Sequence, residues 1–342
     1  MALPEPQSQF RAGATLAGRR VLVTGAAGFI GSHLTEALLG VGAEVTAVIR
    51  YNSRGDIGAL RQIPAAECAK LNVVTADLKD LAALVQAVKG IDVVFHLGAL
   101  IGIPYSYIHP ADYVQTNVVG TTNVLEACRN AGVSRIVQFS TSEVYGTARY
   151  VPIDEDHPLQ AQSPYAASKI AADQLALSYF RSFGLPVAIA RPFNTYGPRQ
   201  PARAIIPTII GQALAGSTIR LGSLTPLRDM NYVADTVAGT LRIAESDAAI
   251  GEVINLGSAR EISVGDIAQL IFKAVGGNFR IETDPTRVRP EKSEVHRLLA
   301  DCSKAARLLN WQPTISVEEG IARTVAWARQ NLDLLKTDRY HV

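Results

Sequence analysis

Hydrophobic and polar positions form two patterns that take turns along the chain between residues 20 and 197. Short, apolar, β-branched runs predict buried strands, and segments with apolar residues three and four positions apart predict helices. The predicted strands are residues 20–25 (RVLVTG), 43–50, 71–78, 91–99, 134–140 (SRIVQFS) and, with a following loop, 186–197. The predicted helices are residues 28–42, 81–90, 113–132 and 163–184.

This succession of strands and helices indicates the α/β fold class. Several strands are apolar on both sides, as expected when helices cover both faces of a sheet. Strand–helix–strand units predict right-handed crossovers and a Rossmann-type, doubly wound parallel sheet. Beyond Gly197 helices mix with short strands, and EVINLGS (252–258) predicts a late strand that returns to the sheet. We expect a sheet domain of residues 18–192, with 229–257 returning to it, and a smaller interleaved C-terminal lobe of residues 193–228 and 258–335.

Composition narrows the class of protein. The chain has 342 residues, 48% of them hydrophobic, which is enough for a large core. The net charge is +2 with mixed signs, which argues against a nucleic-acid binder. Apolar runs stay below the ~18 residues of a membrane span, and the N-terminal residues do not resemble a signal peptide. Three distant cysteines predict reduced thiols, no metal site and a cytoplasmic protein: Cys68, Cys128 and Cys302.

The segment TGAAGFIG lies between the first predicted strand and the first predicted helix. Gly25 allows a tight turn, Gly28 lets the backbone approach a pyrophosphate, and Gly31 permits close helix–strand packing. The amides and dipole of the helix N-terminus favour an anion there. Because the glycines occur in this strand–turn–helix context, we expect the sheet domain to bind a dinucleotide.

The second strand ends on Arg50, with Arg54 close behind, where an acid would bind the adenosine ribose of NAD. Arginine also suits the extra phosphate of NADP, so NAD and NADP both stay open. Asp77 and Leu78 are expected to face the adenine, and we interpret His96 as a packed strand-end residue. Further expected cofactor contacts are Ala27, Phe29, Ile30, Asn52, Ser53, Leu97, Gly98, Ala99, Ser140 and Pro192.

Tyr165 and Lys169 lie four positions apart and hence on one face of a predicted helix. A lysine beside a tyrosine lowers the pKa of the phenol electrostatically, so that the phenolate can act as a base near neutral pH. A surface pair would be the ordinary interpretation of this spacing alone. Together with the glycine turn, Asn117 and the run STSEVYG at a strand end, the pair indicates catalysis.

These motifs resemble the extended short-chain dehydrogenase/reductase family of nucleotide-sugar epimerases and dehydratases. The resemblance covers roughly Arg20 to Leu332 and includes RPFNTYGPRQ and RDMNYVADTV. It implies a tightly bound, recycled NAD(P), Tyr165 as base and Lys169 on the nicotinamide ribose. It also implies that Thr141 bonds the 4-hydroxyl of the sugar and that Asn117 steadies the active-site helix.

Glu143 separates the reactions of this family. An epimerase removes hydride from carbon 4 and returns it to the other face, and no carboxylate is needed. Once carbon 4 is a ketone, a carboxylate can remove the proton on carbon 5 and the 6-hydroxyl can leave as water. We therefore expect a 4,6-dehydratase. Many such enzymes have Asp before the Glu, whereas this chain has Ser142, so either Glu143 or a relay through Ser142 protonates the leaving group.

Segment by segment, the chain looks like the 4,6-dehydratases of the legionaminic-acid pathway, which act on nucleotide-linked N-acetylglucosamine. RGDIGALRQIPAAECAK (54–70) matches less well. The resemblance implies a UDP-sugar substrate, most simply UDP-N-acetylglucosamine, bound by the smaller lobe. Arg228 and Arg289 are expected to clamp the diphosphate. The other expected substrate contacts are Tyr105, Ser106, Thr141, Glu143, Asn194, Arg203, Ala204 and Ile205.

Other functions stay open at this stage. UDP-glucuronate decarboxylases of the family share the TSE run, and a 4-epimerase needs a subset of the same residues. A non-catalytic NAD(P)-sensing protein would have no need for Thr141, Glu143, Tyr165 and Lys169 together. Family members pair two long helices as a four-helix bundle. We therefore expect a homodimer through residues 117–130 and 165–183.

Overall fold

A sheet of seven parallel strands forms the centre of the molecule. The computed structural model describes residues 16–288 and 290–335. The strand order is β10-β6-β5-β4-β1-β2-β3, and every neighbouring pair is parallel. The strands are β1 (Arg20–Thr24), β2 (Glu44–Ile49), β3 (Asn72–Thr75), β4 (Val93–His96), β5 (Arg135–Phe139), β6 (Val187–Pro192) and β10 (Val253–Leu256).

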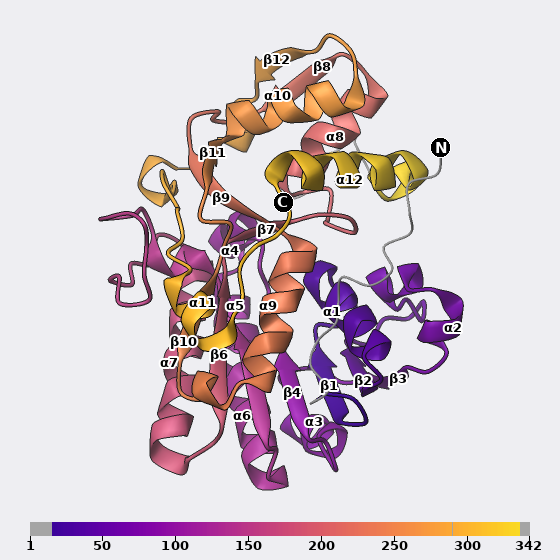
Figure 1. Cartoon of the computed structure of the whole chain (residues 1–342), viewed down its shortest axis with the longest axis vertical. Helices are drawn as coiled ribbons and strands as arrows, with labels where there is room; N and C mark the ends of the chain where they lie inside the picture. The colour runs from indigo at the N-terminus through magenta and orange to yellow at the C-terminus, as the bar shows by residue number, and fades with distance from the viewer. Residues whose placement is uncertain (1–15, 289, 336–342) are drawn as a thin grey trace.

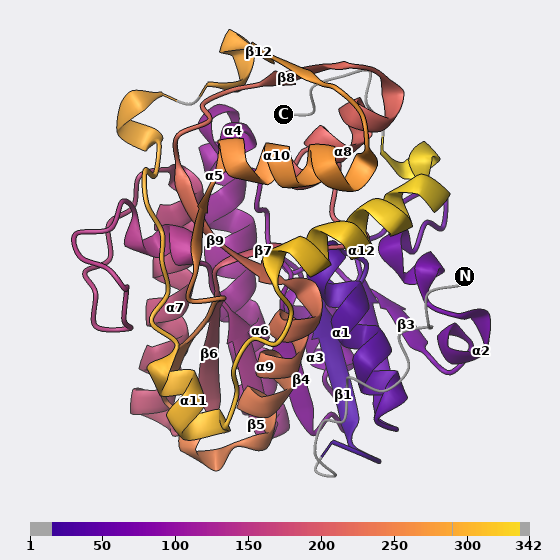
Figure 2. The same ribbon diagram turned by 45° about the horizontal axis from the view of Figure 1, so that its top comes forward.

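Alternate residues of the strands face two separate helical layers. Val21 and Val23 of β1 belong to one buried cluster with residues of α1 and α9, whereas Leu22 belongs to a second cluster with residues of α3, α6 and α7. Figure 2 shows α1 and α9 side by side on one face of the sheet, and these two helices contact each other. The helices are α1 (Phe29–Gly40), α3 (Leu81–Ala87), α6 (Gly120–Ala131), α7 (Pro164–Phe183) and α9 (Val233–Glu245). Helices on both faces confirm the predicted doubly wound α/β fold.

A smaller lobe packs at one end of the sheet, at the top of Figure 1. It contains a three-stranded sheet, β11-β9-β7, and a parallel pair, β12-β8. Its strands are β7 (Asn194–Tyr196), β8 (Thr218–Leu221), β9 (Leu227–Tyr232), β11 (Glu261–Ser263) and β12 (Arg280–Thr283). Its helices are α8 (Ile205–Ala215), α10 (Val264–Val275) and α12 (Val317–Gln330).

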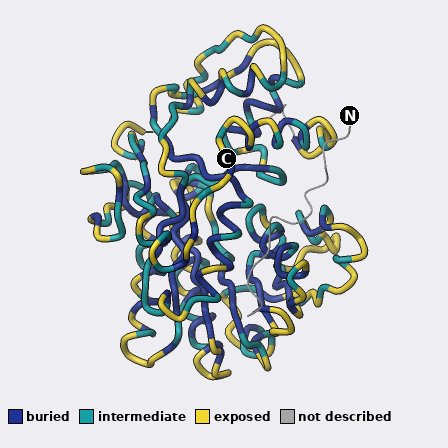
Figure 3. The backbone as a smooth tube through the Cα atoms, viewed as in Figure 1, coloured by how far each residue is buried: buried dark blue, intermediate teal, exposed yellow. Residues whose placement is uncertain are grey.

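The chain crosses between the two parts more than once. β10 pairs with β6 in the central sheet, so the late strand predicted from EVINLGS is present. Residues 229–232 lie in β9 and pair with β7 and β11, so the return to the central sheet begins at α9. Short helices complete the connections: α2 (Ala65–Cys68), α4 (Ile103–Ile108), α5 (Pro110–Tyr113) and α11 (Ser303–Leu309). Buried segments run along the strands in Figure 3.

The helical stretch predicted over residues 113–132 is divided in the structure. α5 ends at Tyr113, a π-helical segment spans Val114–Val119, and α6 begins at Gly120. Single π-helical turns occur frequently at functional sites. Here the turn contains the buried Asn117.

Candidate active site

The turn between β1 and α1 brings backbone amides to the carboxyl edge of the sheet. Gly25 has a φ of +71°, and a Cβ there would meet the Gly98 amide nitrogen at 2.8 Å. A Cβ on Gly31 would lie 2.2 Å from the Gly25 carbonyl oxygen. Gly28 is the exposed N-cap of α1, and no side chain caps the helix. The first amides of α1 are therefore available to an anion such as a pyrophosphate. Ala27, Phe29 and Ile30 are half-buried beside this turn.

The residues after β2 form an exposed loop. The Asn52 side-chain oxygen accepts the amides of Arg54 and Asp56, which fixes the turn. Arg50 and Arg54 are exposed, as are Asn52 and Ser53. Residues Arg50 to Arg54 include no acid. A cation rather than a carboxylate is thus the charged group nearest the end of this strand.

The ends of β3 and β4 lie against each other next to the glycine turn. A Cβ on Gly98 would meet the Leu78 side chain at 2.9 Å. The Asp77 carboxylate accepts the Lys79 amide at 2.9 Å. Leu97 and Ala99, on either side of Gly98, are half-buried. These residues follow β3 and β4, which are separated from each other in the sheet by β1 and β2.

A chain of hydrogen bonds links β1, β4 and the π-helical segment through His96. The Gly98 amide donates to Thr24 Oγ1 at 3.0 Å, and Thr24 Oγ1 lies 2.7 Å from His96 Nδ1. His96 Nε2 lies 3.1 Å from Thr121 Oγ1, which donates to the Asn117 carbonyl at 2.6 Å. Because the Thr121 hydrogen is used there, His96 donates from Nε2 and accepts at Nδ1. Burial lowers the pKa of His96 to about 3, so it is a neutral packing residue, in agreement with the sequence interpretation.

Asn117 joins the π-helical segment to the loop after β4 and to α7. Its side chain exchanges two hydrogen bonds with the Leu100 backbone, at 2.8 and 2.9 Å. Its amide also donates to Ser168 Oγ, which donates in turn to the Tyr165 carbonyl at 2.7 Å. Asn117 therefore holds the first turn of α7 in place.

Tyr165, Thr141 and Glu143 come together at the carboxyl end of β5. Ser163 caps α7, with Pro164 in its first turn, and Tyr165 lies in that turn with its side chain almost fully buried. The Tyr165 phenol hydrogen-bonds the Thr141 hydroxyl. Thr141 also caps the short turn Ser142–Tyr145 by accepting the Glu143 amide. The hydroxyl pair and the carboxylate are thus neighbours, and Ser142 is buried beside them.

The pKa of Tyr165 is raised rather than lowered in this site. Burial is the main cause, and the Glu143 carboxylate adds to it, whereas the Thr141 hydrogen bond and the Arg203 charge act in the opposite direction. Lys169 is not among the largest influences on this pKa, and its ammonium donates to the Phe139 carbonyl at 2.6 Å. Burial also lowers the pKa of Lys169 itself. The net shift of the phenol pKa in the protein alone is thus upward, and the lowering by Lys169 expected from the sequence stays a prediction.

Aromatic side chains continue from Tyr165 towards α4. The Tyr113 ring lies 6.2 Å from that of Tyr165 and 6.1 Å from that of Tyr105, between ring centroids. Tyr105 is partly exposed, while Ser106 is buried and donates to the Ile103 carbonyl. The Ser106 hydroxyl is therefore used within α4, and Tyr105 is the better placed of the two to meet a ligand.

The other expected ligand contacts come from the ends of β5 and β6 and from the start of α8. Asn194 follows β6, and its side-chain oxygen is buried without a hydrogen-bond partner among the described residues. Arg203 is exposed, and its charge influences both Tyr113 and Tyr165. Ala204 is the N-cap of α8, and Ile205 begins that helix. Pro192 ends β6 and is buried, and Ser140 follows β5. Arg289 lies outside the described residues.

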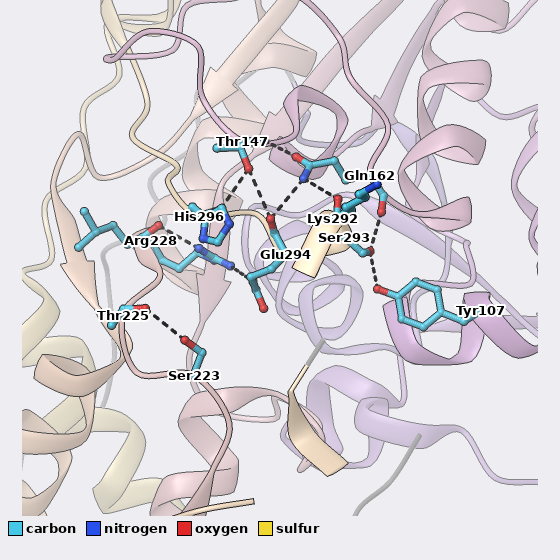
Figure 4. Close-up of polar contacts among 11 residues, drawn as sticks. Tyr107, Thr147, Gln162, Ser223, Thr225, Arg228, Lys292, Ser293, Glu294 and His296 are labelled. Carbon is cyan, nitrogen blue, oxygen red and sulfur yellow. Dashed lines mark hydrogen bonds and ion pairs between the residues drawn. The ribbon is translucent and has the colours of Figure 1, made fainter. Parts of the chain in front are cut away.

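Arg228 is held by an acid that the sequence interpretation did not assign to the site. Arg228 Nη2 donates to Glu294 Oε1 at 2.9 Å, and both side chains are largely buried. Figure 4 shows this pair beside the residues that fix the segment 291–298, which we call the crossing segment. Glu294 lies in the motif RPEKSEVHRL, 66 residues after Arg228. The sequence alone therefore did not indicate that the two residues pair.

The crossing segment is held by the loop before α7 and by α4. Gln162 Nε2 donates to the carbonyls of Lys292 and Glu294, and Thr147 Oγ1 donates to the Glu294 carbonyl. Ser293 Oγ donates to the Gln162 carbonyl and accepts from Tyr107 Oη, each at 2.6 Å (Figure 4). The crossing segment thus links α4 to the lobe that carries Arg228.

Within the described part of the chain, no group of three or more His, Cys, Asp or Glu side chains is arranged to hold a metal ion. No described helix has both the length and the apolar character of a membrane span.

Comparison with known proteins gives one family. Residues 22–324 match the family model described as GDP-mannose 4,6 dehydratase. The chain is 34% identical to a UDP-glucuronate 4-epimerase of Thermodesulfobacterium geofontis, over 92% of this chain and 98% of the relative. It is 35% identical to a dTDP-glucose 4,6-dehydratase of Streptomyces antibioticus, over 91% of this chain and 92% of the relative.

A solved structure of similar fold is the DesIV dTDP-glucose 4,6-dehydratase double mutant of Streptomyces venezuelae, determined with NAD bound. Its TM-score is 0.83 at 32% identity, and the match covers 91% of this chain and 97% of that one. Epimerases and dehydratases thus match this chain at similar identity.

Proposed function

Because the chain belongs to the GDP-mannose 4,6-dehydratase family, within the extended short-chain dehydrogenases/reductases, we propose that it is a nucleotide-sugar 4,6-dehydratase. The family indicates a nicotinamide cofactor and a nucleotide-sugar substrate. The observation that supports dehydration over epimerisation is the position of Glu143 beside Thr141 and Tyr165. A carboxylate there serves elimination, whereas epimerisation needs the two hydroxyl groups alone.

The site residues fit a nicotinamide dinucleotide. Side chains at Gly25 or Gly31 would collide with backbone, so this turn is shaped for close approach to a pyrophosphate. Gly28 and the amides that follow it would hold the pyrophosphate, and Lys169 would hold the nicotinamide ribose. When bound, the cofactor supplies hydride acceptance from carbon 4 and hydride return to carbon 6. NAD is bound in the solved relative, while Arg50 and Arg54 leave NADP open for this chain.

Tyr165 has the role of the base for the 4-hydroxyl. In its ionised form the Tyr165 oxygen would take the proton of the 4-hydroxyl. Thr141, which hydrogen-bonds Tyr165, would bond the oxygen of the same hydroxyl. Since burial raises the pKa of Tyr165, the phenol keeps its proton until positive charge is brought near it. The Arg203 charge already lowers the pKa of Tyr165, and Lys169 lies one helical turn after Tyr165 on α7.

Glu143 has the role of the base for carbon 5. A ketone at carbon 4 makes the carbon 5 proton acidic, and the carboxylate takes it while the bond from carbon 6 to its hydroxyl breaks. The departing hydroxyl receives one proton, from Glu143 directly or through Ser142, and leaves as water. Once carbon 6 has received hydride and carbon 5 has taken a proton from solvent, the product would be a 4-keto-6-deoxy sugar nucleotide, with one water lost from each substrate.

The substrate we propose is a UDP-sugar, UDP-N-acetylglucosamine first, as in the legionaminic-acid type of dehydratase. Arg228 and Arg289 would bind the diphosphate, and Asn194 offers a buried oxygen without a protein partner among the described residues. Asn194, Arg203, Ala204 and Ile205 lie around the entrance to α8 and would contact the rest of the ligand.

Incubation with a panel of nucleotide sugars in deuterated water, followed by mass spectrometry, tests the reaction. Dehydration predicts the loss of one water and the gain of one deuterium at carbon 5. A product of unchanged mass with inverted carbon 4 would show an epimerase. Loss of carbon dioxide from UDP-glucuronate would show a decarboxylase. Binding of NAD(P) without turnover of any sugar in the panel would favour the non-catalytic sensor.

A 4-epimerase is the second candidate, because one relative is a UDP-glucuronate 4-epimerase of nearly equal identity. Tyr165 and Thr141 suffice for that reaction. Removal of the Glu143 carboxylate distinguishes the two candidates, because an epimerase would keep its turnover without it.

We also propose a homodimer through α6 and α7. These helices contact each other, and Val119, just before α6, and Phe183, at the end of α7, are exposed. Two copies would complete a four-helix bundle over these apolar side chains. Light scattering at micromolar concentration is expected to give twice the monomer mass, and a monomer there would contradict the proposal.

A further inference from the structure

Five buried side chains form a hydrogen-bonded cluster next to the candidate active site. Arg191 in β6 donates to Asp173 Oδ2 at 2.8 Å and to Tyr145 Oη at 2.8 Å. Ser140 Oγ donates to the same Asp173 oxygen at 2.5 Å. Tyr145 Oη donates onward to Asn255 in β10. Arg191 and Asp173 are 2% and 0% exposed, so this ion pair is removed from water.

The cluster contacts both halves of the candidate active site. Tyr145 ends the short turn that carries Glu143, and the Arg191 guanidinium lies 4.8 Å from the Tyr145 ring centroid. Asp173 lies one helical turn after Lys169 on α7, and both side chains are buried. Arg191 therefore connects the Glu143 turn to the helix that carries Tyr165 and Lys169.

The side-chain hydrogen bonds of Asp173 with the described residues involve only one of its two carboxylate oxygens. Its Oδ1 atom is buried and has no hydrogen-bond partner among the described residues. The cost of burying an ionised carboxylate falls when cations lie near it. Arg191 is one such cation, and Lys169 is the other on the same side of α7.

Lys169 has few other charges around it. His96 on β4 is neutral, and Tyr165 keeps its proton in the protein alone. Arg191 on β6 has the same sign as Lys169, and Glu143 acts on Tyr165. Burial lowers the pKa of Lys169, and the Asp173 charge is the influence that raises it.

We propose that Asp173 is a positioning residue that keeps Lys169 in its ammonium form and, with Arg191 and Tyr145, sets the Glu143 turn against Tyr165. The proposal rests on the proposed function for the importance of Lys169. It goes further by assigning an electrostatic role to a carboxylate that contacts neither substrate nor cofactor. Because Asp173 also pairs with Arg191, the Asp173 carboxylate raises the pKa of Lys169 less than it would without Arg191.

The two members of the ion pair are therefore expected to act in opposite directions. Asp173→Asn removes the negative charge and leaves Arg191 unpaired, so the pKa of Lys169 falls. Arg191→Gln leaves Asp173 with Lys169 as its cation, so the pKa of Lys169 rises. We expect shifts of about one pH unit in each direction. Asp173→Glu keeps the charge and is expected to restore most of the wild-type behaviour. A purely structural role of the pair predicts losses of stability without opposed shifts.

The measurement follows the lysine side chains by NMR over pH 6 to 11 on the full chain. The sequence holds eight lysines, and the signal lost in Lys169→Arg identifies Lys169. In the wild type this signal is expected to show the ammonium form at neutral pH. A neutral Lys169 at pH 7 in the wild type would overturn the proposal even if no variant folds. Equal or like-signed shifts in Asp173→Asn and Arg191→Gln would overturn it as well.

The same variants separate this proposal from the proposed function. The alkaline limb of cofactor reduction, read at 340 nm with the active nucleotide sugar, should move down in Asp173→Asn and up in Arg191→Gln. If the wild type reduces no cofactor with any sugar, the proposed function fails while the NMR shifts still decide the role of Asp173. Asp266→Asn, an exposed aspartate on α10, is the matched control and should change neither readout.

Discussion

At the scale of single residues, the chemistry turns on how charges act on buried groups. The Glu143 carboxylate raises the pKa of Tyr165, so the two proposed bases influence each other. The proton on Tyr165 leaves more easily when Glu143 is neutral. An active site with two bases of this kind benefits from using them in sequence, first the phenol and then the carboxylate.

Glu143→Gln is expected to stop the reaction after oxidation. Steady-state turnover should fall about 10²- to 10⁴-fold, the usual contribution of a general base, while reduced cofactor accumulates. Because the charge that raises the pKa of Tyr165 is gone, the acid limb of cofactor reduction should move to lower pH. Stopped-flow absorbance across pH measures both effects. Glu67→Gln, in an exposed pair with Lys70, is the control; normal turnover in Glu143→Gln would remove the assigned role.

His96 makes a prediction for stability. Its pKa of about 3 in the fold lies below the ~6.5 of an unfolded chain. The unfolded state therefore binds one more proton between those values, and the free energy of unfolding should fall by about 1.4 kcal/mol per pH unit as pH drops from 6.5 towards 3. Urea unfolding across pH measures the slope. In His96→Asn this part of the slope should vanish, and an unchanged slope would contradict the neutral form of His96.

Sequence reasoning found these residues but not their mutual influence. Tyr165, Lys169, Thr141 and Glu143 were chosen from spacing and resemblance, and Tyr165, Thr141 and Glu143 do lie together. Spacing did not show that the Lys169 ammonium bonds the Phe139 carbonyl, because that partner lies 30 residues away along the chain. The ion pair of Asp173 and Arg191 was not predicted for the same reason, because the two residues lie on different elements that only the fold brings together.

At the scale of elements, the turn from β1 to α1 is the most constrained junction of the site. Gly31 faces the Gly25 carbonyl, and Gly25 faces the backbone of Gly98. Three backbone segments therefore meet with no room for a side chain. The sequence predicted this junction because glycine is required by local geometry, which is encoded within a few neighbouring positions.

Gly31→Ala should displace α1 from the turn and weaken dinucleotide binding. The added Cβ would lie 2.2 Å from the Gly25 carbonyl oxygen, so the helix must shift. We expect at least a tenfold weaker affinity for NAD(P), measured by equilibrium dialysis with the cofactor removed and added back. Gly40→Ala in the same helix is the matched control, because a Cβ there has no atom within 4 Å. Equal affinities in the two variants would contradict this account of the turn.

Other elements were predicted less completely. Ser316 caps α12, since its hydroxyl accepts the Glu319 amide. The N-cap of α11 is Cys302, and Asp301 accepts the Ser303 amide from one position earlier. The sequence analysis predicted one continuous helix over residues 113–132 and did not predict the π-helical segment around Asn117.

At the scale of the whole molecule, the crossing segment connects the two parts that would enclose a ligand. Tyr107 in α4 belongs to the sheet side, whereas Arg228 in β9 belongs to the lobe, and residues 293 and 294 contact one each. A substrate bound between them would be retained by both contacts. The alternation of strands and helices predicted the two parts, but it carried no information about the path of residues 291–298.

Tyr107→Phe should loosen this connection without changing the chemical groups. It removes one hydrogen bond, worth about 1 kcal/mol, so we expect KM for the nucleotide sugar to rise about fivefold with kcat nearly unchanged. Steady-state kinetics on the active substrate provide the measurement. Tyr150→Phe, which removes a bond to Asp154 on an exposed loop, is the control. A fall in kcat with an unchanged KM would argue against retention of substrate by this contact.

The bonds from Gln162 and Thr147 to the crossing segment end on the main-chain carbonyls of residues 292 and 294. Every amino acid carries such a carbonyl, so exchanges at these two positions leave those attachments in place. Lys292 can therefore vary in charge and size while these bonds are kept, whereas Glu294 is also fixed by its side-chain ion pair with Arg228. Because Lys292 is exposed, substitution there changes the surface of the crossing segment without rebuilding its path.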